Sequence, residues 1–362
     1  MTKLKNHPRN PLKSIESAPF ATSASNVQRR HPLQSAKSAN IAVIGGGYWG
    51  KNLVRNFYEL GVLKTVSDLN QNALDALKKN YPEINITQKF EDVALDKNIK
   101  GVVIATPAAT HHQVVKKFLL AGKDVFVEKP LALNIKHGEE LVKLAEKQKC
   151  ILMVGHLLLY HPAVIKLKEL IEQGELGKIR YIHSNRLNFG KLRTEENILW
   201  SFAPHDIAVI IDLMGKLPKK ICSHGMDWLS KNVADSTLSY FEFDKNQAAH
   251  IFVSWLNPFK EQKLSVIGEK KMAVFDDQAE NKLIVYPHKV EWLGKIPEAK
   301  KAEGEIISLP QLEPLRQECQ HFLDCIETRK NPKSDGREAL NVLKILNACQ
   351  KSLDKKSKII KL

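Results

Sequence analysis

A glycine-rich turn, Gly45–Gly50 with the sequence GGGYWG, follows a short apolar run near the start of the regular part of the sequence. Its spacing fits the G-x-G-x-x-G pattern of dinucleotide-binding turns. In such a turn Gly45 permits the tight bend, Gly47 lets the backbone approach a pyrophosphate, and Gly50 lets the helix pack close to the strand. The N-terminus of that helix then faces the negative charge. The pattern therefore predicts a dinucleotide site.

Asp68 lies eighteen positions after Gly50, at the end of the next predicted strand. A carboxylate there accepts hydrogen bonds from the ribose hydroxyls of adenosine and would repel the 2′-phosphate of NADP. No arginine follows immediately, since the next residues are Leu69 and Asn70. The sequence therefore favours NAD over NADP as the cofactor. The alternative is that Asp68 is a plain surface turn residue.

Further along the chain, Lys129 and His205 could each move a proton. Lys129 comes directly before a proline at the end of the predicted strand Asp124–Val127, at the sheet edge where ligands of parallel-sheet folds bind. A lysine can act as general acid or base if burial and a neighbouring cation, such as an oxidised nicotinamide, lower its pKa. His205 is of the type that titrates near neutral pH. The alternatives are a solvated turn lysine and a helix N-terminal histidine bonded by the backbone.

Two other groups of reactive residues are weaker candidates. Ser201, His205 and Asp206 suggest a hydrolytic triad, but no G-x-S-x-G turn precedes them, and adjacent His and Asp side chains rarely point at one another. The segment Cys319–Cys325, with two cysteines and a histidine, suggests a metal site. Its spacing does not place the three on one helix face, and no CxxC or HExxH motif accompanies them. We therefore expect neither a hydrolase nor a bound metal.

The elements that must position these residues alternate between strand and helix patterns from Asn40 to Gly155. The predicted strands are Ile41–Ile44, Val62–Ser67, Ile84–Thr87, Gly101–Thr106, Asp124–Val127 and Cys150–Val154. The predicted helices are Tyr48–Leu60, Asn72–Lys79, Phe90–Leu95, His111–Leu120 with Thr110 as its cap, and Ile135–Gln148 with Asn134 as its cap. This alternation predicts an α/β fold with a doubly wound parallel sheet, a Rossmann domain over residues 40–155.

Beyond Gly155 the pattern changes to strand-like runs with short turns, which predicts an α+β domain over residues 156–362 with a large, mainly antiparallel sheet. Helices are expected at Pro162–Gln173 and Pro310–Lys351. We expect one face of this sheet to be broad, exposed and partly apolar, with Val253 and Trp255 on it. Such a face needs a cover, so the sequence predicts a homodimer or homotetramer.

Length and composition limit the class of protein. The chain has 362 residues, 43% of them hydrophobic, and its apolar runs are far shorter than the ~20 residues of a membrane span. Two domains and no membrane segment are therefore expected. The formal net charge is +15, but residues 1–40 supply +6 of it, and the remaining lysines alternate with acidic residues. This distribution is typical of solvated faces rather than of a nucleic-acid protein.

The first 39 residues contain no helical or alternating period and predict a disordered basic tail, with an organelle transit peptide as the alternative. Five cysteines without a secretory segment predict reduced thiols and a cytoplasmic protein.

The sequence resembles the glucose–fructose oxidoreductase/inositol dehydrogenase family of nicotinamide-dependent sugar and cyclitol oxidoreductases, from about Ile41 to the C-terminus. The likeness is carried by GGGYWG, by ATPAATH at Ala105–His111, by AGKDVFVEKPLA at Ala121–Ala132 and by WSFAPHD at Trp200–Asp206. The stretches GYWGKN and GHLLLYHPAV are most similar to members associated with nucleotide-sugar oxidation in surface-polysaccharide assembly.

The resemblance implies a role for particular residues. Lys129 would contact the reacting hydroxyl, and His205 would take or return its proton. Many members have Asp four residues before that histidine, where this chain has Ser201, and the change would leave His205 more weakly basic. The implied cofactor-binding residues are Gly45, Gly47, Tyr48, Trp49, Gly50, Asp68, Thr106, Pro107, His111 and Glu128.

Substrate contacts are expected from Arg186, Asn188 and Arg193 in one stretch, and from Tyr160 after the last strand of the first domain. Guanidinium and amide groups suit sugar hydroxyls, a carboxylate or a diphosphate. The sequence thus predicts an NAD-dependent oxidoreductase acting on a sugar ring hydroxyl, with a nucleotide-linked sugar such as a UDP-N-acetylhexosamine or its uronate as substrate. The alternatives are a free cyclitol or aldose dehydrogenase and a non-catalytic NAD sensor.

Overall fold

Six parallel strands form the first sheet of the computed structural model, which describes residues 39–362. Their order is β3-β2-β1-β4-β5-β6, so the chain winds outward in both directions from β1 and β4. The carboxyl ends of these two central strands form the ligand-binding edge of such a sheet. The strands are β1 (Asn40–Ile44), β2 (Leu63–Ser67), β3 (Asn85–Thr87), β4 (Ile99–Ile104), β5 (Asp124–Val127) and β6 (Leu152–Val154).

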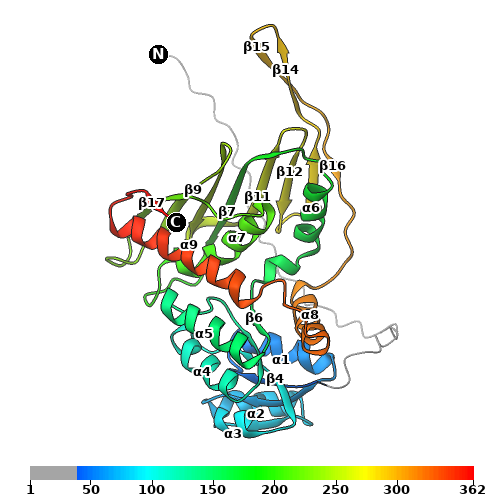
Figure 1. The fold of residues 1–362 in the computed structure, drawn as a ribbon, viewed down its shortest axis with the longest axis vertical. Coiled ribbons are helices and arrows are strands. Elements are labelled where there is room, and N and C mark those ends of the chain that lie inside the picture. The colour runs from blue at the N-terminus through cyan, green and yellow to red at the C-terminus, as the bar shows by residue number, and fades with distance from the viewer. Residues whose placement is uncertain (1–38) are drawn as a thin grey trace, which may run out of the picture. The chain divides into compact units, whose positions relative to one another are not determined.

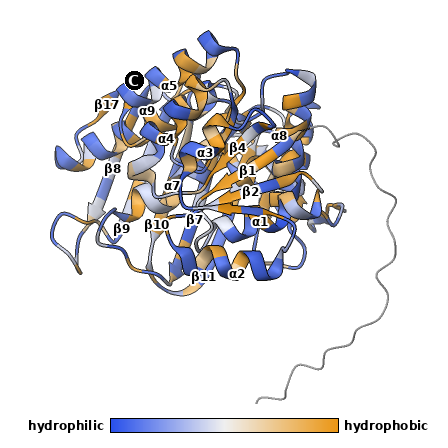
Figure 2. Cartoon of the chain, turned by 90° about the horizontal axis from the view of Figure 1, so that it is seen from below, coloured by the Kyte–Doolittle hydropathy of each residue, from blue (hydrophilic) through white to orange (hydrophobic). Residues whose placement is uncertain are grey.

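Helices connect these strands and cover the sheet. They are α1 (Gly50–Glu59), α2 (Gln71–Asn80), α3 (Phe90–Leu95), α4 (Ala108–Leu120) and α5 (Ile135–Gln148). Because helices lie on both faces, the strands are apolar at successive positions, and Ile41 to Val43 are fully buried. Figure 2 shows β1, β2 and β4 as a hydrophobic centre. The predicted doubly wound parallel sheet is confirmed.

Of the two predicted helix caps in this domain, the structure shows one. Asn134 caps α5 as expected, since its side chain accepts a hydrogen bond from the N–H of His137 at 2.9 Å. Thr110 does not cap α4, which already begins at Ala108. The Thr110 hydroxyl donates instead to the carbonyl oxygen of Pro107 and lies 2.7 Å from the Thr106 hydroxyl. The helix starts earlier because Pro107 suits a helix N-terminus.

The second sheet has nine strands in the order β16-β13-β12-β11-β7-β10-β9-β8-β17. Every neighbouring pair is antiparallel except β7 and β10, as the predicted mainly antiparallel sheet requires. Figure 1 shows α6 (Pro162–Glu172), α7 and α9 against one face. The strands are β7 (Ile179–Phe189), β8 (Lys220–Met226), β9 (Ser236–Phe243), β10 (Gln247–Ser254), β11 (Leu256–Gly268), β12 (Met272–Asp276), β13 (Leu283–Tyr286), β16 (Glu305–Ile306) and β17 (Ile360–Lys361).

Helix α7 (Ile198–Met214) is one element that sequence reasoning missed. It packs between the second sheet and α9 and is buried on nearly all sides, so it has no polar face and shows no helical period. Pro204 inside it further hides the helical pattern, because proline removes one backbone donor. This helix carries His205.

The predicted C-terminal helix Pro310–Lys351 is two helices, α8 (Pro314–Thr328) and α9 (Gly336–Asp354). Arg329, in the left-handed region with φ of 57°, ends α8. A short turn, η1 (Leu157–Tyr160), follows the first sheet and packs against α8. Both C-terminal helices return to the first domain, where α8 packs on α1 and α9 on α5. The C-terminal segment therefore holds the two domains together.

The prediction that Val253 and Trp255 are exposed is wrong. Both are 1% exposed. Val253 lies on the buried face of β10, and Trp255, just after that strand, donates its buried indole N–H to Asp235 at 2.6 Å. The open side instead carries Leu238 and Tyr240 of β9. A separate hairpin, β14 (Lys289–Leu293) and β15 (Ile296–Lys300), projects beyond the sheet (Figure 1) and was not predicted.

Two predictions concern termini and membranes. The predicted tail over residues 1–39 lies, apart from Ala39, outside the described residues. Within the described part of the chain, no helix has both the length and the apolar character needed to cross a bilayer.

Candidate active site

The glycine-rich turn joins β1 to α1 and leaves room for a ligand backbone. Gly45 has a φ of +96°, which favours glycine, and a Cβ on Gly50 would lie 1.8 Å from the carbonyl oxygen of Gly45. At Gly47, no atom of the described residues lies within 4 Å of the position that a Cβ would take. An open turn at a helix N-terminus fits a pyrophosphate. The residues present therefore fit a dinucleotide.

Asp68 lies directly after β2 and faces this turn. One carboxylate oxygen, Oδ2, accepts from the N–H of Gly46 at 2.7 Å, and Oδ1 accepts from the N–H of Asn70 at 2.8 Å. Both oxygens keep a free lone pair, so a carboxylate oriented in this way can still accept from ribose hydroxyls. Asp68 is thus part of the turn's architecture and not a plain surface residue.

Thr106, Pro107 and His111 follow β4 and meet the turn that follows β5. The buried ring of His111 lies between them, with Nδ1 2.7 Å from the carbonyl oxygen of Pro130 and Nε2 2.9 Å from that of Thr106. Burial lowers the pKa of His111. Both ring nitrogens thus lie within hydrogen-bond distance of main-chain carbonyl oxygens, so His111 connects the two turns.

Glu128 connects the glycine-rich turn to the end of β5. Its Oε1 accepts a hydrogen bond from the indole Nε1 of Trp49 at 2.5 Å, while the neighbouring Tyr48 points into solvent. Burial raises the pKa of Glu128 to about 7, and the indole hydrogen bond and the charge of Lys129 oppose that rise. The structure thus brings Trp49 and Glu128, two of the residues predicted to bind the cofactor, into direct contact.

Lys129 links the two domains. Its Nζ donates to the main-chain carbonyl oxygen of Ser201, on α7, at 2.7 Å. Burial lowers the pKa of Lys129, and the charges of Glu196 and Glu128 oppose that change. The ammonium is therefore desolvated and held in place, which contradicts the alternative of a solvated turn lysine. Ser201, which stands where many family members have Asp, thus contacts Lys129 through its main-chain carbonyl oxygen.

His205 follows Ser201 by one turn of α7. Its Nδ1 is buried and has no hydrogen-bond partner among residues 39–362. Burial, together with the positive charges of Lys129 and Arg186, lowers the pKa of His205 well below 6.5. The imidazole is therefore neutral at neutral pH and can accept a proton. It lies inside the helix, not at its N-terminus, and its ring is not bonded by the backbone.

Asp206 is engaged away from His205, which contradicts the hydrolytic triad. Its Oδ2 accepts from Nε of Arg186 at 2.6 Å, and its Oδ1 accepts from the hydroxyl of Ser184 at 2.6 Å. This buried pair joins α7 to β7. Asp206 therefore orients Arg186 and leaves His205 without a carboxylate.

The remaining predicted substrate residues fall in two places. Asn188 lies two residues after Arg186 on β7 and thus on the same face of the strand. Arg193 pairs with Glu196 at 2.8 Å, and both charges act on Lys129, so this pair borders the site. Tyr160 is different, because it is buried, its hydroxyl bonds the hydroxyl of Ser334 at 2.9 Å and its ring packs against His321. None of its described contacts reaches Lys129 or His205.

One residue of the site was missed by sequence reasoning. His156 directly follows Gly155 after β6, is 2% exposed, and has an Nδ1 without a partner in the described residues. The charge of Lys129 acts on it, and its own charge acts on His205. The position at the carboxyl edge of a parallel strand was the available signal, since residues there line the ligand side.

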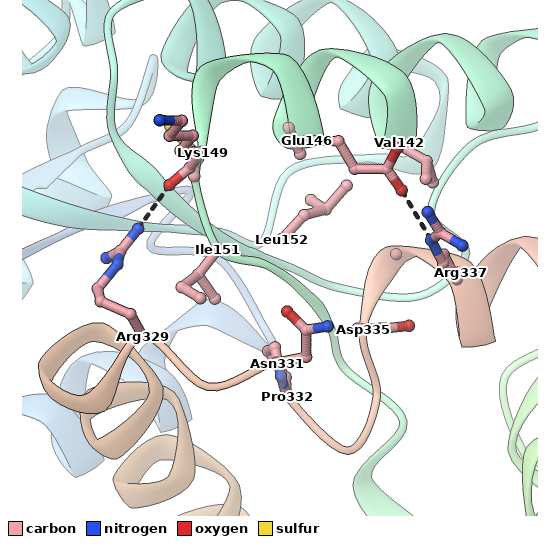
Figure 3. A pocket seen from close by; sticks show the side chains of 13 residues that line it. Val142, Glu146, Lys149, Ile151, Leu152, Arg329, Asn331, Pro332, Asp335 and Arg337 are labelled. Atoms are coloured by element: carbon pink, nitrogen blue, oxygen red, sulfur yellow. Dashed lines mark hydrogen bonds and ion pairs between the residues drawn. The ribbon is translucent and has the colours of Figure 1, made fainter.

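The larger surface hollows lie elsewhere. One of about 480 Å³ lies between the end of α5 and the loop from α8 to α9, where Arg329 donates to the carbonyl oxygen of Lys149 and Arg337 pairs with Glu146 (Figure 3). Two of its basic groups, Arg329 and Arg337, are thus already paired. No three His, Cys, Asp or Glu side chains converge as a metal site among residues 39–362.

The chain is similar to two dehydrogenases of known substrate. UDP-N-acetylglucosamine 3-dehydrogenase of Acidithiobacillus ferrooxidans is 23% identical over 307 residues, which cover 83% of this chain and 93% of that protein. Its solved structure matches with a TM-score of 0.77 at 21% identity, covering 87% and 97% of the chains. The scyllo-inositol 2-dehydrogenase (NAD(+)) of Bacillus subtilis is 25% identical over 309 residues, 80% of this chain and 87% of that protein.

A third relative in fold is levoglucosan dehydrogenase, solved in complex with NADH and levoglucosan, with a TM-score of 0.77, 18% identity and coverage of 89% and 99%. Two family models also match. The oxidoreductase family NAD-binding Rossmann fold spans residues 39–156, and the oxidoreductase family C-terminal alpha/beta domain spans residues 168–362. The chain therefore belongs to the GFO/IDH/MocA oxidoreductase family, and its N-terminal domain is an NAD-binding Rossmann fold.

Proposed function

We propose that this protein is an NAD-dependent dehydrogenase that oxidises a ring hydroxyl of a sugar, and that the sugar is nucleotide-linked. The observation that carries this proposal is the meeting of Lys129 and His205 from two domains. The ammonium of Lys129 bonds the backbone one turn before His205, and its charge acts on that imidazole. An ammonium and a neutral imidazole at the NAD-binding edge form a site for alcohol oxidation.

Each group has one task in this reaction. NAD, when bound, supplies the hydride acceptor for the carbinol carbon. The ammonium of Lys129 donates a hydrogen bond to the substrate oxygen and stabilises the negative charge that develops there. The neutral imidazole of His205 accepts the proton of the hydroxyl. Ser201 and Glu196 hold Lys129 in place through a hydrogen bond and an opposite charge.

Two observations support different substrates. Arg193 borders the site, Lys191 lies two residues before it in the sequence, and both side chains suit a diphosphate. A UDP-N-acetylglucosamine 3-dehydrogenase is also among the relatives. This favours a nucleotide-linked sugar and a role in surface-polysaccharide sugar synthesis. However, Arg186 and Arg193 are already paired with Asp206 and Glu196, which leaves less positive charge for a diphosphate. A free cyclitol or aldose is therefore the second candidate.

A panel assay tests this function. The protein is incubated with NAD and, in turn, UDP-N-acetylglucosamine, scyllo-inositol, myo-inositol and levoglucosan, and reduced nicotinamide is followed by absorbance. We expect His205→Asn and Lys129→Met to lower kcat by about 100-fold or more, as the loss of a general base or of charge stabilisation does. NADH affinity should stay within about twofold of wild type, a change in binding free energy of less than about 0.5 kcal/mol.

The controls are His288→Asn, next to the β14–β15 hairpin, and Lys143→Met on α5, which should keep wild-type rates. NAD binding without turnover on any sugar would favour the sensor. A Lys129→Met variant with the wild-type rate would contradict the role given to Lys129.

We also propose that a second copy of the chain covers the open face of the nine-stranded sheet. Leu238 and Tyr240 are 44% and 46% exposed there, and the β7–β10 region adds Tyr181, His183 and His250, which pack together as half-buried rings. Apolar and aromatic side chains on one broad face are typical of oligomer interfaces.

A further inference from the structure

We propose that His156 is a third polar group of the reacting centre, one that hydrogen-bonds the substrate hydroxyl on the ring carbon next to the one oxidised. This inference rests on the proposed dehydrogenase function and extends it to the substrate class. It predicts a substrate with hydroxyls on two neighbouring ring carbons.

The backbone brings residue 156 to this place. The N–H of Gly155 donates to the carbonyl oxygen of Val127 at 2.8 Å, and the N–H of His156 donates to that of Val154 at 2.7 Å. A Cβ on Gly155 would lie 2.9 Å from Oε2 of Glu128. The chain therefore passes directly against the carboxylate of Glu128, which a side chain at 155 would have to displace. His156 is the first side chain after this passage.

The ring of His156 lacks a partner in the described part of the chain. It is 2% exposed, and its Nδ1 is buried without a hydrogen bond, as is Nδ1 of His205. Buried polar atoms are nearly always bonded in native proteins, so an unbonded one indicates a partner that is supplied from outside the chain. Two such imidazoles beside one ammonium indicate a ligand with more than one hydroxyl.

His156 and His205 are both neutral imidazoles in this site. Burial and the positive charge of Lys129 lower the pKa of His156 to about 3. The ring of His156 therefore stays neutral at any working pH, and the proposed function already gives the proton to His205. A neutral imidazole offers one donor and one acceptor, which suits a hydroxyl that is bound but not oxidised. His156 thus binds and orients substrate, and His205 handles the proton.

The test compares two substrates in the wild-type protein and in two variants. His156→Phe removes the polar atoms and keeps a planar ring, and His156→Gln keeps a donor and an acceptor. Each is assayed with the panel substrate that turns over and with its deoxy analogue: UDP-N-acetylglucosamine against its 4-deoxy form, or scyllo-inositol against a deoxy-inositol. In wild type the deoxy analogue should lose about 10-fold in kcat/KM, the effect of one hydrogen bond, mainly through KM.

In His156→Phe the full substrate should lose the same factor while the deoxy analogue changes by less than about twofold, so that discrimination disappears. His156→Gln should recover part of it. NADH affinity, thermal unfolding and the pH profile of kcat should match wild type. The control is His288→Phe, which should leave the discrimination unchanged.

Two results overturn the proposal. An equal loss of kcat/KM on both substrates in His156→Phe would make His156 a structural residue. No loss of kcat/KM on either substrate would show that the ring of His156 does not bind the substrate. If wild type turns over no sugar, the proposed function fails, and binding of the same pairs in the presence of NADH then decides about His156. Equal affinities of wild type and His156→Phe for both members of the pair would overturn it.

Discussion

Burial sets the protonation of the groups that surround Lys129. It lowers the pKa of Lys129 and His205, and it raises the pKa of Glu128 to about 7. Glu196 and Glu128 oppose the change at Lys129, whereas nothing negative opposes the change at His205. The site therefore keeps an ammonium beside a neutral imidazole, the pair of protonation states that alcohol oxidation needs.

These directions predict the pH profile of kcat/KM for oxidation. Since the pKa of His205 lies well below 6.5, lowering the pH from 8 to 6.5 leaves the base neutral and should change the rate little. Since the pKa of Lys129 is lowered from 10.5, the cation is lost early, and the rate should fall at a pH below 10.5. Initial rates across pH 5 to 11 measure both limbs.

Lys129→Arg keeps its charge to a higher pH and should move the alkaline fall upward, because arginine does not lose its proton in this range. Lys143→Arg on α5 is the matched control. A profile that rises through pH 6.5 as for an ordinary histidine would contradict the neutral base.

At the scale of elements, two connections build the site. The β1–α1 turn forms the cofactor edge, and α7 delivers Ser201 and His205 from the second domain to Lys129. The two glycines of the turn have separate tasks. Gly50 allows α1 to pass close to Gly45, whereas Gly47 leaves open space for a ligand.

Alanine at these two positions should therefore give opposite results. Gly47→Ala should fold with an unchanged melting temperature but bind NADH at least about 10-fold more weakly, because its methyl group takes the space of the pyrophosphate. Gly50→Ala should lower the melting temperature, because its Cβ would lie 1.8 Å from a backbone oxygen that cannot move aside. Thermal unfolding and fluorescence titration with NADH separate the two effects. Wild-type NADH affinity in Gly47→Ala would place the cofactor elsewhere.

At the scale of the whole molecule, the two faces of the nine-stranded sheet differ. Helices α6, α7 and α9 cover one face, and Val253 and Trp255 are buried beneath them. The other face exposes Leu238 and Tyr240 from β9. Exposed apolar side chains on a broad sheet face are typical of an interface between copies of a chain.

We expect size-exclusion chromatography with light scattering to give the mass of a dimer or a tetramer. The double variant Leu238→Lys/Tyr240→Lys should shift the mass toward the monomer, because two lysines on each copy repel across a two-fold interface. Lys300→Glu in β15, outside the sheet, is the control. A monomer at every concentration of the wild-type chain would contradict the proposed cover.

Local pattern was enough for most of the first domain. Parallel strands buried on both faces are continuous apolar runs, and Asp124–Val127 is predicted to the residue. The glycine turn and the Asn134 cap are also local, since each depends on residues within one turn. Where burial erases the period, pattern fails, as at α7, and where a left-handed residue interrupts a helix, as at Arg329, the break is invisible in the sequence.

The sequence by itself predicted the dinucleotide-binding turn and Asp68, because both belong to one short motif, and it predicted Lys129 and His205 as reacting residues through the resemblance of their motifs to a known family. Only the tertiary structure decided their partners. In the structure, the main-chain carbonyl oxygen of Ser201 accepts a hydrogen bond from Lys129, and Asp206 pairs with Arg186 instead of His205. His156 lies close enough to Lys129 and His205 for their charges to interact. Such pairings join segments that lie far apart in the chain, and they depend on how two domains pack, which no local period records.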